Sequence, residues 1–177
     1  MKAGLILIAT LASYSLLGQT PLNRVSTYDV ASYRYKDAYV KVTYGRPAKK
    51  NREIFGKLVP FGEIWRTGAN EATEITLTRD VTILGKLVAA GTYSLFTIPQ
   101  ENQWTIIFNK EVGAWGAYNY NQKLDFARWN VPVTKTQGKA LENFTISFEN
   151  KNNIAILTLC WDDVCTALPI QFNEPKL

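Results

Sequence analysis

Hydrophobic and polar residues alternate along much of the chain, which is the pattern of strands that bury one face. In the segment AYVKVTYGRP, Lys41 and Thr43 fall on one face, while Val40 and Val42 fall on the other. Pro47 ends this run, because proline cannot donate a hydrogen bond to a neighbouring strand. The segment therefore predicts a strand that stops before Pro47.

Further alternating segments follow at short intervals. Residues 74–110 are predicted to form a meander, in which Gly91 marks one turn and residues 99–103 link two strands. Two later strands are separated by the polar turn KNN at 151–153, and the last strand begins at Val164. Strands at this spacing favour a sandwich or barrel over β-α-β units. We therefore predict an all-β fold, a single antiparallel sandwich of jelly-roll type.

Helical patterns are scarce, and we expect one or two short helices. Residues 50–60 are compatible with one or two helical turns, ended by Gly56 and Pro60. Residues 121–130 are compatible with a short helix or an extended crossing, ended before Pro132.

The N-terminal segment has the pattern of a secretory signal peptide. Lys2 precedes an apolar stretch from Leu5 to Leu17, and Gly18 follows it. This order predicts a signal peptide over residues 1–19 and a single β-sandwich domain over 20–177. The protein is then exported to the periplasm or the outside of a bacterium. The alternatives are a buried N-terminal helix or an uncleaved anchor.

The two cysteines lie on either side of a predicted hairpin turn. In NIAILTLCWDDVCTALPIQF, a two-residue turn at Asp162 and Asp163 would place Cys160 opposite Cys165. Opposed residues in such a pair lie within the range of disulfide geometry. An exported protein meets an oxidising compartment, so we predict a disulfide, with two buried thiols as the alternative.

Composition excludes several kinds of chemistry. The 177 residues include no histidine, which rules out Ser-His-Asp triads, Cys-His dyads and histidine metal sites. The net charge of +5 is spread along the chain, with only one short basic run, KKNR, so a nucleic-acid partner is not expected. Two turn carboxylates are too few for a calcium cage, and we expect no metal and no cofactor.

The segment GEIWRTGANEAT, residues 62–73, gathers directional polar groups beside a tryptophan. One interpretation is a structural corner whose side chains satisfy the backbone of a long loop. The other is a binding site in which aromatic rings and planar polar groups hold a sugar or an anionic small molecule. The candidate ligand-binding residues are Arg46, Arg52, Trp65, Arg66, Asn70, Glu71, Trp115 and Tyr118.

The motifs GRP, REIFG, LVPFG, WRTGANE and AGTYSLFTIP lie between residues 44 and 110. Together they resemble a bacterial envelope family catalogued as domain of unknown function 2911. The resemblance extends more loosely to Pro169. It implies an exported β-rich domain, and it implies no activity and no catalytic residues.

These observations favour an exported, non-catalytic envelope protein that binds a small polar ligand or glycan through residues 44–73. One alternative is an accessory or structural subunit that docks a protein partner in the envelope. Another is a histidine-free hydrolase that would use carboxylates from the set Glu53, Glu63, Glu71 and Glu74.

Overall fold

The computed structural model describes residues 25–136 and 138–173, and it is all-β. The first strands are β1 (Thr27–Tyr35), β2 (Ala38–Arg46), β3 (Thr73–Leu77), β4 (Val81–Ile83), β5 (Lys86–Val88) and β6 (Gly91–Pro99). The others are β7 (Gln103–Asn109), β8 (Asp125–Lys135), β9 (Leu141–Lys151), β10 (Ile154–Asp162) and β11 (Val164–Phe172). A 3-10 turn, η1 (Gln122–Leu124), precedes β8.

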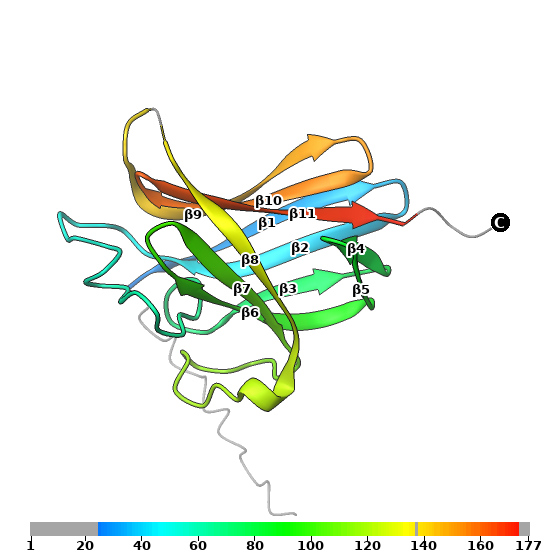
Figure 1. Ribbon diagram of the computed structural model, residues 1–177, viewed down its shortest axis with the longest axis horizontal. Coiled ribbons are helices and arrows are strands. Elements are labelled where there is room, and N and C mark those ends of the chain that lie inside the picture. The colour runs from blue at the N-terminus through cyan, green and yellow to red at the C-terminus, as the bar shows by residue number, and fades with distance from the viewer. Residues whose placement is uncertain (1–24, 137, 174–177) are drawn as a thin grey trace, which may run out of the picture.

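The strands form one nearly closed antiparallel sheet (Figure 1). Its order is β1-β2-β3-β6-β7-β8-β11-β10-β9, and the short β4 and β5 pair with each other beside the end of β11. Strand β8 crosses the molecule, because residues 125–132 pair with β7 and residues 133–135 pair with β11. One strand thus joins the two halves of the sheet.

The opposite seam lies between the end of β2 and β9. The N–H of Phe144 donates to the carbonyl of Pro47 (2.9 Å), and the N–H of Lys49 donates to the carbonyl of Glu142 (2.6 Å). At the other end of the seam, the hydroxyl of Tyr33 donates to Asn150 Oδ1 (2.8 Å). These bonds hold β9 against β1 and against the residues that follow β2.

The space inside the sheet is filled by the apolar face of each strand. Val40 and Val42 are fully buried, and Lys41 between them is more exposed, as the sequence predicts. At one end of this core the rings of Phe55, Trp65 and Trp104 pack together, with centroid separations between 5.0 and 6.2 Å. The long segment between β2 and β3 supplies two of these three rings.

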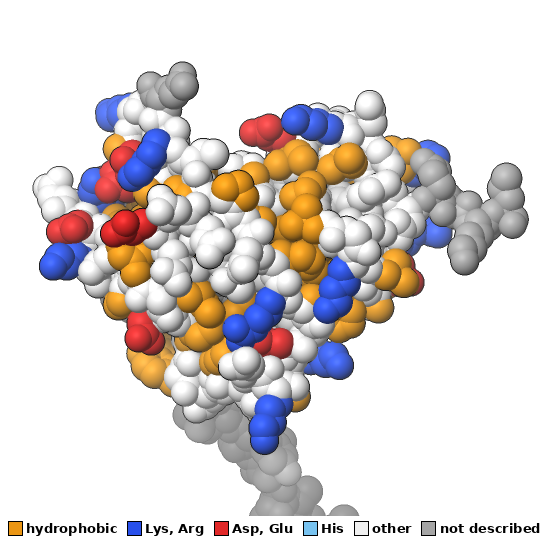
Figure 2. All heavy atoms as spheres, in the orientation of Figure 1, with side chains coloured by type: hydrophobic (Ala, Val, Ile, Leu, Met, Phe, Trp, Pro, Cys, Tyr) orange, Lys and Arg blue, Asp and Glu red, His pale blue; other side chains and the backbone are white. Residues whose placement is uncertain are grey.

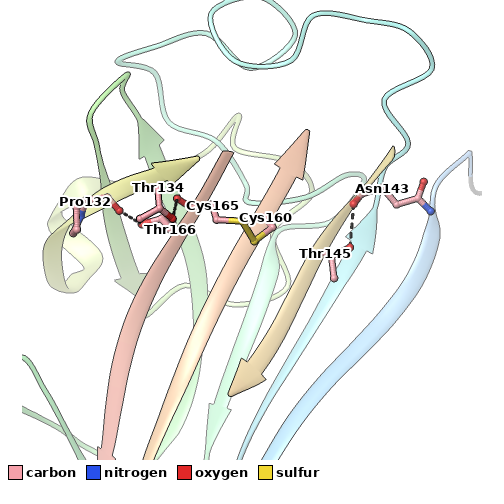
Figure 3. The surroundings of a disulfide bond; sticks show 7 residues. All are labelled: Pro132, Thr134, Asn143, Thr145, Cys160, Cys165 and Thr166. Carbon is pink, nitrogen blue, oxygen red and sulfur yellow. Dashed lines mark hydrogen bonds between the residues drawn. A yellow bond between two sulfur atoms is a disulfide. The ribbon is translucent and has the colours of Figure 1, made fainter. Parts of the chain in front are cut away.

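The predicted hairpin and disulfide are confirmed (Figure 3). Trp161 lies opposite Val164, and Cys160 is bonded to Cys165 with the two Cα atoms 4.2 Å apart. Near the disulfide, the Thr166 hydroxyl donates to the carbonyl of Pro132 (2.9 Å). This bond fixes the hairpin against β8.

Other expectations need correction. Residues 50–60 form turns instead of a helix, and of residues 121–130 only Gln122–Leu124 are helical, because the strand β8 begins at Asp125. Jelly-roll connectivity is not confirmed, since strands adjacent in the sequence are mostly neighbours in the sheet.

The predicted signal peptide, residues 1–19, lies outside the described residues. Within the described part of the chain, no helix is long and apolar enough to cross a membrane.

Candidate functional site

The segment between β2 and β3, residues 47–72, crosses one end of the sheet and is held by its own polar side chains. The Arg52 guanidinium donates to the carbonyls of Lys49 (2.9 Å) and Ala48 (2.6 Å). Backbone bonds join Trp65 to Thr97 of β6 in both directions, at 2.8 and 2.9 Å. The crossing is therefore an ordered part of the fold.

Arg46, a predicted binding residue, lies at the seam between β2 and β9. Its guanidinium donates to the carbonyl of Phe144 (3.3 Å) and to the hydroxyl of Thr145 (3.2 Å), and it lies 3.6 Å from Asp29. Arg46 is not among the residues that line the pocket around Arg66. The structure gives this side chain a structural role.

Trp65 belongs mostly to the core, with 7% of its surface exposed. Its ring stacks on Trp161, and its Nε1 donates to the carbonyl of Gly68 (3.1 Å). The hydroxyl of the buried Thr73 donates to the carbonyl of Thr67 (2.7 Å). These contacts match the structural-corner interpretation of residues 65–73.

Arg66 differs from Arg46 and Arg52 in its hydrogen bonding. Its Nε is buried, and no described residue accepts a hydrogen bond from it. Burial lowers the pKa of the guanidinium, and the phenol of Tyr118 acts in the opposite direction. Among the described residues no carboxylate is paired with Arg66, and burying an unpaired N–H of a cation is costly because the lost hydration at that atom is not repaid.

Arg66 lines a pocket of about 290 Å³ on the crossing segment. Lys50 and Arg52 add two further positive charges, and no described acidic residue lines it. Trp65 and Asn70, two other predicted residues, lie in the same wall. Four of the eight predicted binding residues, Arg52, Trp65, Arg66 and Asn70, therefore meet at one basic pocket.

Three other predicted residues, Glu71, Trp115 and Tyr118, lie beside this pocket. Here the segment before η1, residues 110–121, pairs with residues 70–72. The N–H of Gly116 donates to the carbonyl of Asn70 (3.0 Å), and Glu71 forms a β-bridge with Trp115. Trp115 and Tyr118 have 54% and 85% of their surfaces exposed. The structure thus brings the exposed aromatic side chains to the edge of the Arg66 region.

Comparison with known protein families identifies this chain. A family model described as "Protein of unknown function (DUF2911)" matches residues 26–170. The chain belongs to the DUF2911 family. No match was found among curated proteins or among solved structures.

The matched region of this DUF2911 protein includes a second pocket on the outer face of the sheet, with a volume of about 450 Å³. Tyr28, Glu71 and Glu74 are in its wall. Glu74 accepts a hydrogen bond from the N–H of Gly113 (2.8 Å), so this carboxylate anchors the segment before η1.

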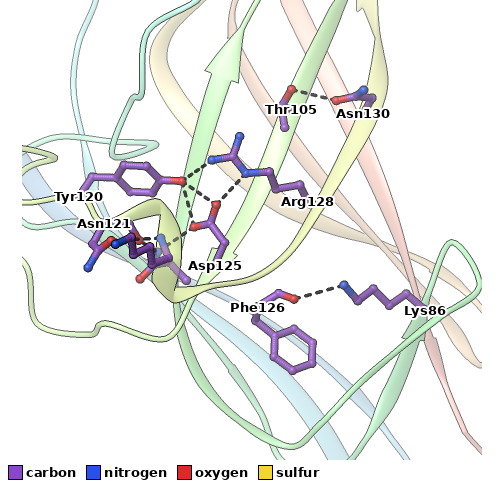
Figure 4. Close-up of polar contacts among 10 residues, drawn as sticks. Lys86, Thr105, Tyr120, Asn121, Asp125, Phe126, Arg128 and Asn130 are labelled. Carbon is purple, nitrogen blue, oxygen red and sulfur yellow. Dashed lines mark hydrogen bonds and ion pairs between the residues drawn. The ribbon is translucent and has the colours of Figure 1, made fainter.

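That segment is also anchored by a polar network at the start of β8 (Figure 4). The hydroxyl of Tyr120 donates to Asp125 (2.7 Å to Oδ2) and accepts a hydrogen bond from Arg128 (2.6 Å). Burial, and then the hydrogen bond to Asp125, raises the pKa of Tyr120 to about 12. Tyr120 therefore anchors the chain at the start of β8.

A third pocket, of about 460 Å³, was not predicted from the sequence. It lies among the 53–61 turns, the β6–β7 turn and the β10–β11 turn, and its wall contains Glu53, Phe61, Trp104 and Asp163. Local patterns predicted the β6–β7 and β10–β11 turns but not the turns at 53–61, and the meeting of the three depends on closure of the whole sheet. Charged side chains of both signs are scattered over the face in Figure 2. A pocket lined mainly by side chains of one sign therefore differs from the rest of this surface.

Proposed function

We propose that this DUF2911 protein is an exported, non-catalytic binding protein that holds a small anionic ligand in the Arg66 pocket. The observation that carries the proposal is the Arg66 guanidinium, which is half-buried and has no hydrogen-bond partner at Nε among the described residues. A bound carboxylate or phosphate would supply the missing partner, because the guanidinium fork matches both groups.

The rest of the pocket supports a small, partly polar ligand. Lys50 and Arg52 give the pocket an excess of positive charge, which attracts anions. The Asn70 amide can hydrogen-bond hydroxyl groups, while Leu58 and Val59 offer apolar surface. A volume of about 290 Å³ suits a ligand the size of one sugar. We infer that the ligand class is a monosaccharide or similar polyol that carries an acidic group.

Export to the cell envelope is part of the proposal. It is supported by the charge and apolar pattern of residues 1–19. The Cys160–Cys165 disulfide also supports it, because such bonds persist in oxidising compartments.

A thermal-shift screen of the purified protein tests the binding proposal. The panel contains uronic acids, sugar phosphates and the matching neutral sugars. We expect at least one acidic compound to stabilise the protein by about 2.7 kcal/mol at a hundredfold excess over its Kd, with no effect from its neutral counterpart. Arg66→Gln should abolish the shift, and Arg34→Gln, on the exposed side of β1, should keep it.

If no acidic compound acts, or if the neutral sugars act equally, the proposal is wrong. The same holds if Arg66→Gln retains the full shift.

A second candidate function is the docking of a protein partner in the envelope. It is supported by the exposed side chains of Val112, Trp115 and Tyr118 on one short segment. Trp115→Ala would weaken such docking and leave the Arg66-dependent shift intact, which separates the two functions.

A further inference from the structure

The 460 Å³ pocket that the sequence did not predict has a lining of opposite charge to that of the Arg66 pocket. Four carboxylates line it, from Glu53, Glu101, Asp162 and Asp163, against one cation, Lys135. Asp163 is paired with Lys135 (2.9 Å), and Asp162 is paired with Lys49 (2.5 Å). No ion pair within the described residues involves Glu53 or Glu101. The pocket therefore keeps an excess of negative charge.

Acidic side chains are common on turns, so these carboxylates alone do not identify a binding site. Trp104 provides independent evidence, because its side chain is fully buried and lines the same pocket. The other three buried tryptophans, Trp65, Trp129 and Trp161, each donate their indole N–H to a backbone carbonyl at 3.1 Å. The Nε1 of Trp104 has no acceptor in the described part of the chain.

An unpaired buried N–H is costly, and Trp104 belongs to the wall of this pocket, so a ligand oxygen that reached its Nε1 would repay that cost. The turns around the pocket add negative charge. A ligand that satisfies both features carries a positive group and a hydroxyl or carbonyl oxygen.

Aromatic rings favour an organic cation over a metal ion. Phe55 is half-buried and packs on Trp104, with centroids 5.0 Å apart, and Phe61 has 37% of its surface exposed. Ring faces attract ammonium groups. Among the described residues, no group of three or more carboxylates or cysteines is placed to hold a metal ion.

We propose that this pocket binds a small organic ammonium ion that also carries a hydroxyl or carbonyl oxygen. The ammonium group lies against Phe61, near the carboxylates of Glu53 and Glu101. The oxygen accepts the hydrogen bond from Trp104 Nε1. This site uses none of the residues proposed to bind an anion, so a negative result at one site does not contradict the proposal for the other.

The test is a titration with choline, followed through the indole N–H resonances of the purified protein by NMR at low ionic strength. Choline has both required groups, whereas tetramethylammonium lacks the oxygen. We expect choline to shift the Trp104 indole resonance in a saturable way and to leave the Trp129 resonance in place. Tetramethylammonium should bind more weakly and cause a smaller shift at Trp104.

Variants of Glu53 and Glu101 measure how much their charges contribute to choline binding. Glu53→Gln with Glu101→Gln should weaken choline binding about tenfold, because two attractive charges are removed. Glu149→Gln, an exposed carboxylate on β9, is the matched control and should bind as the original protein does. Arg66→Gln should also bind choline normally, so loss of the anion site does not decide this test.

The proposal is overturned if choline leaves the Trp104 resonance unmoved at millimolar concentration. It is also overturned if the double variant binds choline as tightly as the Glu149→Gln control.

Discussion

The indole ring of Trp65 lies nearly parallel to that of Trp161, with the ring centroids 6.0 Å apart and the planes 18° apart. Trp65 belongs to the segment that crosses one end of the sheet, and Trp161 belongs to the disulfide-bonded hairpin. The stack therefore links two parts of the chain nearly a hundred residues apart. It fixes the floor of the Arg66 pocket, because both rings line that pocket.

We predict that Trp65→Ala lowers the free energy of unfolding by about 3–5 kcal/mol, the usual cost of emptying a large aromatic site. Urea denaturation measures the change. Trp115→Ala is the matched control, since Trp115 has 54% of its surface exposed, and it should cost less than about 0.5 kcal/mol. Equal losses in the two variants would show that Trp65 does not support the crossing segment.

A second prediction concerns the close approach of Gly45 to Ala69. A Cβ atom on Gly45 would lie 2.0 Å from the carbonyl oxygen of Ala69, a backbone atom that cannot move alone. The N–H of Ala69 donates to the carbonyl of Gly45 (3.2 Å), so the clash falls on the bonded pair that places the corner. We expect Gly45→Ala to reduce stability by more than about 3 kcal/mol or to prevent folding.

Thermal unfolding by circular dichroism checks this expectation. Gly138→Ala, where an added Cβ has nothing within 4 Å, is the control and should melt like the original protein. A folded Gly45→Ala protein with an unchanged melting temperature would contradict the predicted packing of the corner.

A third prediction concerns alkaline pH. The pKa of Tyr120 is raised from 10 to about 12 by burial and by its hydrogen bond to Asp125. A group whose pKa is higher in the folded state stabilises the fold fully below its unfolded pKa and loses that contribution as pH rises through the folded value. The stabilisation from neutral Tyr120 is thus constant up to about pH 10 and is lost between about pH 10 and 12.

Urea denaturation at a series of pH values tests this window. The stability difference between the original protein and Tyr120→Phe should be constant at neutral pH and shrink above about pH 10. Tyr118→Phe removes an exposed hydroxyl from the same segment and serves as the control. A difference that grows above pH 10 would have the wrong sign for this account.

The parts of the fold predicted from the sequence are those set by local patterns. The alternation of Val40 and Val42 with polar neighbours identifies a half-buried strand without knowledge of its partner. The hairpin register follows from a two-residue turn, which alone places Cys160 opposite Cys165. The closure of the sheet does not follow, since it depends on β8 changing its partner from β7 to β11.

In the candidate site, too, the residue types could be predicted from the sequence, but their contacts could not. The sequence identifies arginines near a tryptophan, but it does not show which backbone carbonyls they meet. Arg46 and Arg52 donate to such carbonyls, whereas no carbonyl in the described part of the chain accepts a hydrogen bond from Arg66 Nε. The three turns around Trp104 come from distant parts of the chain, so no local pattern could have shown that they meet.

The role of Arg66 also predicts how its removal affects stability. Because the described residues provide no acceptor for Nε, Arg66→Gln removes a desolvated charge without breaking a hydrogen bond there. We expect the free energy of unfolding without ligand to stay within about 0.5 kcal/mol or to increase. A loss of 2 kcal/mol or more, about the cost of a broken buried network, would support a purely structural role instead.

The NMR resonance of the Arg66 Nε–H group shows whether Arg66 binds an anionic group. A ligand from the acidic sugar panel is titrated into the labelled protein, and Arg34 on β1 provides the internal reference. We expect a saturable shift of the Arg66 resonance, together with slower exchange of its Nε proton, and no shift at Arg34. An Arg66 resonance that stays in place while the ligand binds elsewhere, or equal shifts at both arginines, would contradict it.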